Sequence, residues 1–222
     1  MRNSVLIYKN KMSEEDRLES LDMFLKYPNS ILSGSLCTDE PVYQLREFLP
    51  NLTAKKIFQL HTNMMPIIAQ DFGLSLEGIE LVTPRYMDPE SNEFLTVDKR
   101  IAGMKLPIHR DIPTGTYTNH HGLDDGKTAI TMTGIFYWND DFVGGELKFD
   151  DELLIDPNDS SSSRTILYKP VAGDFVVFPS YLYHEILPII EGERYSTQYF
   201  FNRTKQYHVT ELPNYEVNYL QK

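Results

Sequence analysis

The first third of the chain contains two stretches in which apolar residues recur at helical spacing. In the first stretch, Ser13 occupies the N-cap position before an acidic turn, and the pattern predicts a helix that ends before Pro28. The residues between 27 and 39 read as a loop, and a short helical turn is predicted around 41–48. We expect the first helix to bury one face, formed by Leu18, Leu21, Phe24 and Leu25.

The second stretch begins at Thr53 and runs through spaced apolar positions to Phe72, with Gly73 where a C-terminal cap belongs. Pro66 lies inside this stretch and predicts a kink, because proline lacks the backbone N–H that a helix interior uses. Residues 1–77 are therefore predicted to be mainly helical.

Beyond residue 78 the chain changes to short apolar blocks separated by turns of Gly, Pro, Asn and Asp. Several short strands with no helical period between them favour a mainly β fold, a jelly roll (double-stranded β-helix) with the early helices packed outside. Residues 78–203 would form this core and residues 204–222 a C-terminal extension. The predicted strands are 79–83, 104–108, 129–137, 146–149, 166–168, 174–179 and 194–201.

Composition and charge narrow the class of protein. The 222 residues are 41% apolar and 12% aromatic, which is enough for a single domain with a sizeable core. A net charge of -11 without a basic cluster disfavours nucleic-acid binding. The apolar run 5–8 is far shorter than a signal-peptide core or a membrane span, and the lone Cys37 has no internal disulfide partner. We expect a soluble, cytoplasmic protein without a membrane partner.

His109 and Asp111 place an imidazole and a carboxylate two positions apart. On an extended backbone both side chains point to the same side, so both can face one ion. Two imidazoles and one carboxylate on one face of octahedral Fe(II) leave positions open for a bidentate 2-oxo acid and for oxygen. His184, just past the strand 174–179, is the natural third ligand. A His-x-Asp triplet alone is also common on protein surfaces.

The residues after Asp111 offer an alternative pair of metal histidines. His120 and His121 lie in a long segment, but neither has a carboxylate two positions later, so His109 is the better candidate. The segments 88–100 and 112–128 could form a flexible cover that closes on substrate.

Arg194 and Ser196 follow His184 on the last predicted strand. A guanidinium pairs bidentately with a carboxylate and keeps its charge, so the two residues could bind the far carboxylate of a dicarboxylic 2-oxo acid. The alternative is a surface ion pair between Arg194 and Glu191 or Glu193.

The order and spacing of several motifs carry a resemblance to a known family. The motifs are Phe136-Tyr137-Trp138-Asn139-Asp140, Gly144-Gly145-Glu146-Leu147, Lys169-Pro170-Val171-Ala172-Gly173-Asp174, Phe178-Pro179-Ser180 and residues 184–201. With them, residues 80–203 resemble the prolyl 4-hydroxylase-like branch of the Fe(II)/2-oxoglutarate oxygenases.

This resemblance implies the roles of individual residues. It makes His109, Asp111 and His184 the catalytic iron ligands. It implies Fe(II), 2-oxoglutarate and O2 as cofactors, with ascorbate in a supporting role. The residues it assigns to 2-oxoglutarate are Arg194, Ser196, Tyr137 and, before the metal strand, Tyr86.

The implied reaction is hydroxylation of an unactivated C–H bond with release of succinate and CO2. Related halogenases replace the metal carboxylate with a small residue, so Asp111 favours hydroxylation. The resemblance favours a prolyl residue of a peptide or protein as substrate, with a free amino acid or small metabolite as the rival. From another class, a metal-binding jelly roll without turnover is the alternative.

Overall fold

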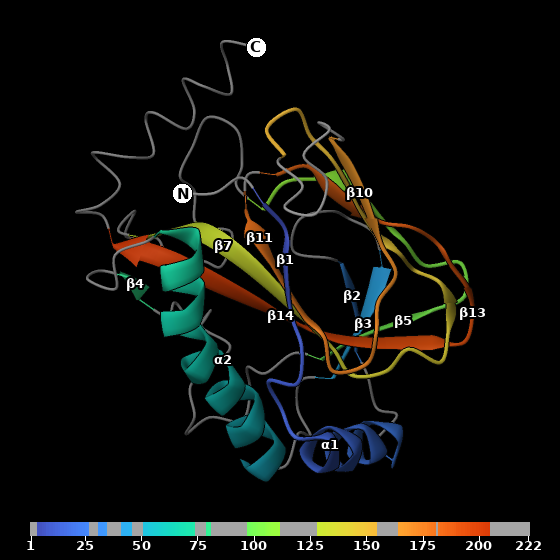
Figure 1. The fold of residues 1–222 in the computed structure, drawn as a ribbon. Coiled ribbons are helices and arrows are strands. Elements are labelled where there is room, and N and C mark those ends of the chain that lie inside the picture. Colours follow the sequence, from blue (N-terminus) through green and yellow to red (C-terminus); the bar gives the residue numbers. More distant parts are fainter. Residues whose placement is uncertain are drawn as a thin grey trace.

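A computed structural model describes residues 4–26, 31–34, 41–45, 51–73, 79–80, 97–111, 128–154, 164–180 and 182–204. Two antiparallel sheets face each other, and two helices lie on the outside of the larger one (Figure 1). This arrangement confirms the predicted mainly β fold with helices packed outside.

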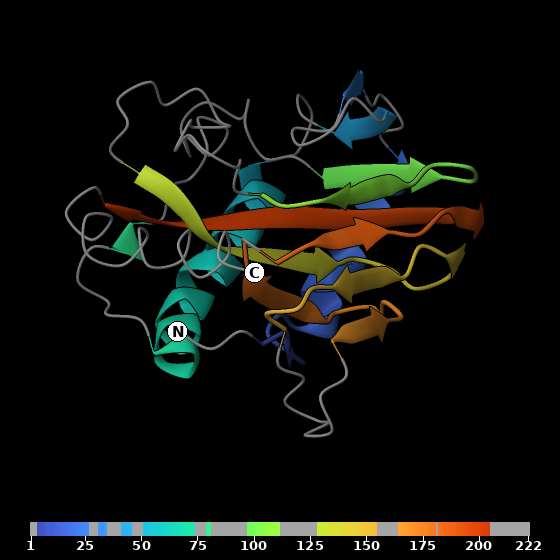
Figure 2. The same ribbon diagram turned by 90° about the horizontal axis from the view of Figure 1, so that it is seen from above.

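The larger sheet has the strand order β1-β11-β7-β14-β5-β3-β2, and β4 also pairs with β14. In Figure 2 the long strand β14 runs through the middle of this sheet, between β5 and β7. Its strands are β1 (Leu6–Tyr8), β2 (Ile31–Gly34), β3 (Pro41–Leu45), β4 (Ile79–Glu80), β5 (Val97–Ile101), β7 (Thr128–Tyr137), β11 (Phe175–Pro179) and β14 (Glu193–Thr204).

The smaller sheet has the order β10-β9-β12-β6, and a separate two-stranded ribbon pairs β13 with β8. Aromatic and aliphatic side chains from both sheets fill the space between them, among them Phe149, Phe178 and Ile186. The bounds of these strands are β6 (Leu106–His109), β8 (Val143–Gly144), β9 (Leu147–Asp150), β10 (Thr165–Tyr168), β12 (His184–Ile186) and β13 (Ile189–Glu191).

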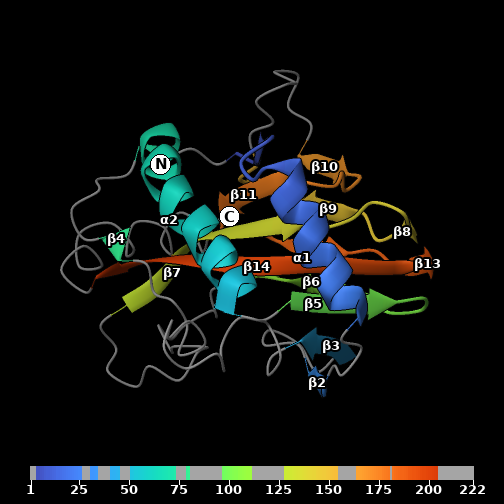
Figure 3. The same cartoon turned by 90° about the horizontal axis from the view of Figure 1, so that it is seen from below.

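Helices α1 (Glu14–Lys26) and α2 (Asn51–Phe72) cover the outer face of the larger sheet, as Figure 3 shows from below. A second core, here called the outer core, lies between these helices and the sheet. In it Phe24 of α1 contacts Trp138, with ring centroids 5.0 Å apart. Gly73 has φ +67°, a left-handed conformation that glycine adopts without steric cost, and it ends α2 as predicted.

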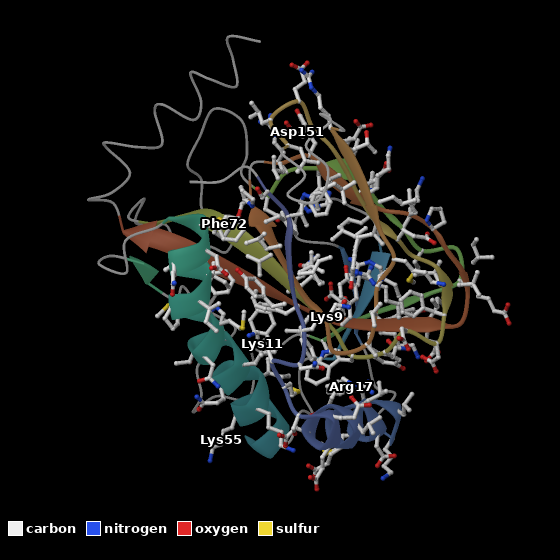
Figure 4. The ribbon with its side chains drawn as sticks, viewed as in Figure 1. Lys9, Lys11, Arg17, Lys55, Phe72 and Asp151 are labelled. Atoms are coloured by element: carbon white, nitrogen blue, oxygen red, sulfur yellow. The ribbon has the colours of Figure 1, made fainter. Side chains whose placement is uncertain are left out.

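The buried face of α1 agrees with the prediction at Phe24 and at the partly buried Leu21, but it differs at Leu18 and Leu25. Leu18 is 49% and Leu25 57% exposed, whereas Arg17, Ser20 and Phe24 are buried. Arg17 lies on the side of α1 that faces the sheet (Figure 4), where it pairs with Glu14 and donates to the backbone carbonyl of Trp138. Apolar spacing predicts that leucines fill the buried face of α1. In the structure Arg17 lies there instead, because its charge and donors are satisfied by Glu14 and a backbone carbonyl.

All seven predicted strands are present, but the chain contains strands that its pattern did not reveal. The predicted loop 27–39 contains β2, and the predicted helical turn at 41–48 contains β3. Both pair within the larger sheet, where β3 lies next to β5. Long-range pairing decides their conformation, so local propensity misassigned them. The first third thus supplies strands as well as helices.

The predicted cover at 88–100 is also partly wrong. Residues 97–101 form β5, which pairs with β14 on one side and β3 on the other. The segment looked like a loop because Asp98 and Arg100 are polar, yet both side chains are buried. Residues 88–96 and 112–127 lie outside the described residues.

Candidate active site

Two neighbouring strands of the smaller sheet bring His109 and His184 together. His109 ends β6 and His184 begins β12, and the antiparallel register places them directly opposite each other. Their ring centroids are 4.3 Å apart. The predicted meeting of two segments distant in sequence is confirmed.

Asp111 joins the pair from just beyond β6. Its backbone N–H donates to the carbonyl oxygen of Ser180 (3.0 Å), which fixes the chain after the strand. Asp111 Oδ1 lies 3.6 Å from His109 Nε2, and Oδ2 lies 3.7 Å from His184 Nε2. One ligand atom from each of the three residues falls within 4.8 Å of the others, and all three residues are buried. They can therefore hold one metal ion.

The hydrogen bonds of the two histidines fix which ring nitrogen is free. His109 Nδ1 lies 2.7 Å from the carbonyl oxygen of Pro107, and His184 Nδ1 lies 2.9 Å from that of Leu182. A carbonyl only accepts, so each Nδ1 carries the proton and each Nε2 turns a lone pair toward the cluster. His109 Nε2 is buried and has no hydrogen-bond partner within the residues that the structure describes. This is the state of imidazole that binds a metal.

Burial and mutual attraction set the protonation of the three groups. Burial lowers the pKa of His184 to about 4, so its ring is neutral at physiological pH. Burial alone would raise the pKa of Asp111, but the two histidines and Thr133 outweigh it and hold that pKa well below its usual range. Burial lowers the pKa of His109, but Asp111 and the carbonyl of Pro107 together outweigh it, so that this pKa is raised. An ionised carboxylate with two imidazoles is a donor set that fits Fe(II).

Thr133, on β7, is a site residue that the sequence reasoning missed. Its hydroxyl donates to Asp111 Oδ2 and lies 3.0 Å from the hydroxyl of Ser180. Both hydroxyl residues are almost fully buried. Alternation along the predicted strand 129–137 could have placed Thr133 on the same face as Tyr137.

The larger sheet contributes Arg194, Ser196 and Tyr137, all about 1% exposed or less. Ser196 lies opposite Tyr137 in the register of β14 and β7. The guanidinium carbon of Arg194 lies 4.9 Å from the centroid of the Tyr137 ring, a cation–π distance. The three predicted residues therefore come together on the inner face of one sheet.

Arg194 is not the surface ion pair that was the alternative. Glu193 pairs with Lys99 at 2.7 Å, and the guanidinium nitrogens of Arg194 are buried without a hydrogen-bond partner among the described residues. Within the same part of the chain the Tyr137 hydroxyl has none either. Gly145 approaches the stem of Arg194: a Cβ at that glycine would lie 3.5 Å from Arg194 Cδ. Unpaired buried donors of this kind suit an anionic ligand.

Two further charged residues that the sequence reasoning missed stand beside this group. Asp98 and Arg100 of β5 are buried, and Asp98 accepts a 3.3 Å bond from Arg100 Nη1. Tyr86, His120 and His121, which the sequence analysis also considered, lie outside the described residues.

Comparison with protein families gives one match: the model of the 2OG-Fe(II) oxygenase superfamily fits residues 99–202. This span contains the His109, Asp111 and His184 cluster together with Arg194 and Ser196. None of the curated proteins matches the chain in sequence.

Solved structures share the fold at low sequence identity. A 2OG-Fe(II) oxygenase family oxidoreductase from Burkholderia pseudomallei is 13% identical, with a TM-score of 0.57 over 90% of this chain and 84% of that one. A prolyl-4-hydroxylase from Pseudomonas putida is 16% identical, with a TM-score of 0.55 over 90% and 92%. A prolyl hydroxylase from Trichoplax adhaerens, solved with a peptide fragment of hypoxia inducible factor, is 14% identical, with a TM-score of 0.59 over 94% and 87%.

No helix in the described part of the chain has the length and apolar character needed to cross a membrane.

Proposed function

The chain belongs to the 2OG-Fe(II) oxygenase superfamily, and from that premise we propose that it hydroxylates a prolyl residue in a peptide or protein. The reaction would consume 2-oxoglutarate and O2 and release succinate and CO2. The observation that carries the proposal is the buried cluster of His109, Asp111 and His184, together with the buried Arg194, whose guanidinium has no hydrogen-bond partner among the described residues.

The three ligand residues would hold Fe(II) through His109 Nε2, His184 Nε2 and a carboxylate oxygen of Asp111. Bound Fe(II) would supply the activation of O2 that no protein side chain provides. Thr133 keeps the carboxylate of Asp111 oriented. The rings of Phe149 and Phe178 pack around His184, with centroids 5.9 and 4.6 Å from it, and exclude water from that side.

The cosubstrate would be oriented by the inner face of the larger sheet. We assign its distal carboxylate to Arg194, with Ser196 and Tyr137 as hydrogen-bonding partners, because these side chains are buried and adjacent. We also propose Tyr86 as a residue that contacts 2-oxoglutarate. Ascorbate would act only in support, by keeping iron reduced between turnovers.

Three considerations support the prolyl substrate and the reaction type. The structural neighbours in Pseudomonas putida and Trichoplax adhaerens are prolyl hydroxylases by name. Asp111 keeps a carboxylate at the metal, which supports hydroxylation over halogenation. The intact cluster in a superfamily of enzymes supports turnover over the alternative of a binding protein.

A free amino acid or small metabolite is the competing substrate class. The cytoplasmic setting stays a prediction.

An anaerobic titration with Fe(II) and 2-oxoglutarate, followed by admission of air, tests the reaction. We expect a visible absorption band from the iron-bound 2-oxo acid and then release of succinate. Proline-containing peptides should increase succinate release and gain one oxygen atom by mass spectrometry, whereas free proline should do neither. Absence of both the band and succinate would overturn the oxygenase assignment. Hydroxylation of free proline alone would replace the peptide substrate with a metabolite.

A further inference from the structure

We propose that Arg100 is a second ligand for the distal carboxylate of the cosubstrate, so that Arg100 and Arg194 grip it from two neighbouring strands. The proposal rests on the proposed use of 2-oxoglutarate and adds a residue that the sequence did not indicate. We call Arg100, Arg194 and Asp98 the charged cluster.

The register of the larger sheet places the two arginines directly opposite each other. Arg194 of β14 pairs with Arg100 of β5, and Ser196 pairs with Asp98 two positions along. Side chains opposite each other in an antiparallel pair lie on the same face, with their Cβ atoms about 4.5–5.5 Å apart. Both arginines are 1% exposed, so both guanidinium groups are directed into the protein.

Two like charges opposite each other, away from water, are unfavourable unless an anion lies between them. In the charged cluster, Asp98 is the only carboxylate, so two positive charges and one negative charge leave a net charge of +1. One carboxylate of a ligand would bring the charged cluster to neutrality. The distal carboxylate of 2-oxoglutarate has that charge.

The hydrogen-bond donors of the charged cluster are also in excess. Asp98 accepts a bond of 3.3 Å from Arg100 Nη1, while Arg100 Nε and the three nitrogens of Arg194 have no hydrogen-bond partner in the part of the chain that the structure describes. A buried donor without a partner destabilises the protein, and a carboxylate can accept from two guanidinium groups at once. The free donors therefore match the free acceptors of a carboxylate.

The competing explanation is that Arg100 serves only as the ion-pair partner of Asp98. Isothermal titration of the Mn2+-loaded protein separates the two explanations, using 2-oxoglutarate and 2-oxopentanoate as probes. The second probe chelates a metal in the same way but carries a methyl group in place of the distal carboxylate. A contact with the distal carboxylate affects only the first probe.

We expect Arg100→Gln to weaken 2-oxoglutarate binding by about tenfold or more, the value of one charge-assisted hydrogen bond. Its affinity for 2-oxopentanoate should stay within about twofold of the wild type, since that probe lacks the group that Arg100 binds. Arg100→Lys should recover part of the lost affinity, because lysine keeps the charge without the planar fork. The affinity for Mn2+ should not change.

Wild-type affinity of Arg100→Gln for 2-oxoglutarate would overturn the inference, and so would an equal loss for both probes. If Arg100→Gln does not fold, the double variant Asp98→Asn/Arg100→Gln removes both partners of the ion pair together, so that Asp98 is not left as a buried charge without its partner. Its expected result is the same selective loss, measured against Asp98→Asn. A wild-type protein that binds Mn2+ but not 2-oxoglutarate would instead refute the proposed function.

Discussion

His109 and His184 lie directly opposite each other on neighbouring antiparallel strands, and both direct Nε2 toward the carboxylate of Asp111. Hydrogen bonds from each Nδ1 to a backbone carbonyl hold both rings in this orientation. The positions of the two histidines are thus set by the backbone of the smaller sheet, and that of Asp111 by the segment directly after β6.

The first prediction concerns the identity of the metal histidines. His109→Ala and His184→Ala should each lower the affinity for Fe(II) or Mn2+ by about 100-fold or more, because each removes one of three protein ligands. His121→Ala is the matched control and should bind metal as the wild type does. The measurement is anaerobic titration calorimetry. Retained affinity in His109→Ala together with lost affinity in His121→Ala would move the first ligand to the segment after Asp111.

The second prediction concerns Thr133, which acts on the metal only through Asp111. Thr133→Val keeps the shape of the side chain but removes the donor to Asp111 Oδ2, so metal affinity should fall by about 10- to 100-fold. Thr133→Ser restores a hydroxyl and should recover most of the affinity. A purely structural role for Thr133 would instead lower the melting temperature and leave the metal affinity of the folded protein unchanged.

The third prediction concerns His61, a histidine of α2 in the outer core. It stacks on Tyr199 and Phe201, with ring centroids 5.2 and 4.6 Å away, and neither ring nitrogen has a hydrogen-bond partner in the described part of the chain. Replacing a buried unsatisfied polar group by an apolar one of similar shape is stabilising, so His61→Phe should raise the free energy of unfolding by about 1 kcal/mol at pH 7. A lower free energy of unfolding would contradict this.

The fourth prediction follows from the same residue and concerns pH. Burial lowers the pKa of His61 to about 3, against 6.5 for the ordinary side chain. Between these values the unfolded chain binds a proton that the folded protein does not, so stability is lost as pH falls from about 6.5 toward 3, by up to about 1.4 kcal/mol per pH unit. Urea denaturation of wild type and His61→Phe at pH 7 and pH 5 measures it. The difference in free energy of unfolding between His61→Phe and the wild type should be larger at pH 5 than at pH 7. An equal difference at both pH values would contradict the lowered pKa of His61.

The fifth prediction concerns Gly134 of β7. A Cβ at this position would lie 2.6 Å from Cζ of Phe175 and 3.2 Å from Cε2 of Phe201, so Gly134→Ala overpacks the outer core and should cost about 1–3 kcal/mol. Gly73→Ala is a useful comparison, because a Cβ there meets nothing within 4 Å and only its φ of +67° is unfavourable. Thermal denaturation should rank Gly134→Ala as the less stable of the two.

The residues of the metal cluster were predictable because their signal is local. His109 and Asp111 are two positions apart in an extended segment, and the motif order located His184 and Arg194. Arg100 was not predicted, because no local motif marks it and its segment looked like a polar loop. In β5 the polar side chains of Asp98 and Arg100 are buried, so the polar alternation that normally indicates a solvated surface here marks inward-facing residues.

The strands β2 and β3 show a different limit of sequence reasoning. Their partners lie outside the local segment, since β3 pairs with β5 more than fifty positions away in the register Tyr43 to Lys99. No pattern within residues 27–48 indicates such a partner. The buried face of α1 was misjudged because Arg17 meets the carbonyl of Trp138, a contact that apolar periodicity does not describe.

The smaller sheet ends, in the part of the chain that the structure describes, at the four-residue strand β6. This strand has one partner, β12, and their register shifts between His184 and Ile186. A metal bound by His109, Asp111 and His184 would therefore stabilise β6, an edge strand whose hydrogen bonds go to β12 alone among the described strands. Metal binding would then be coupled to the local unfolding of β6. The rate of amide hydrogen exchange at β6 would therefore report how much of the metal site is occupied.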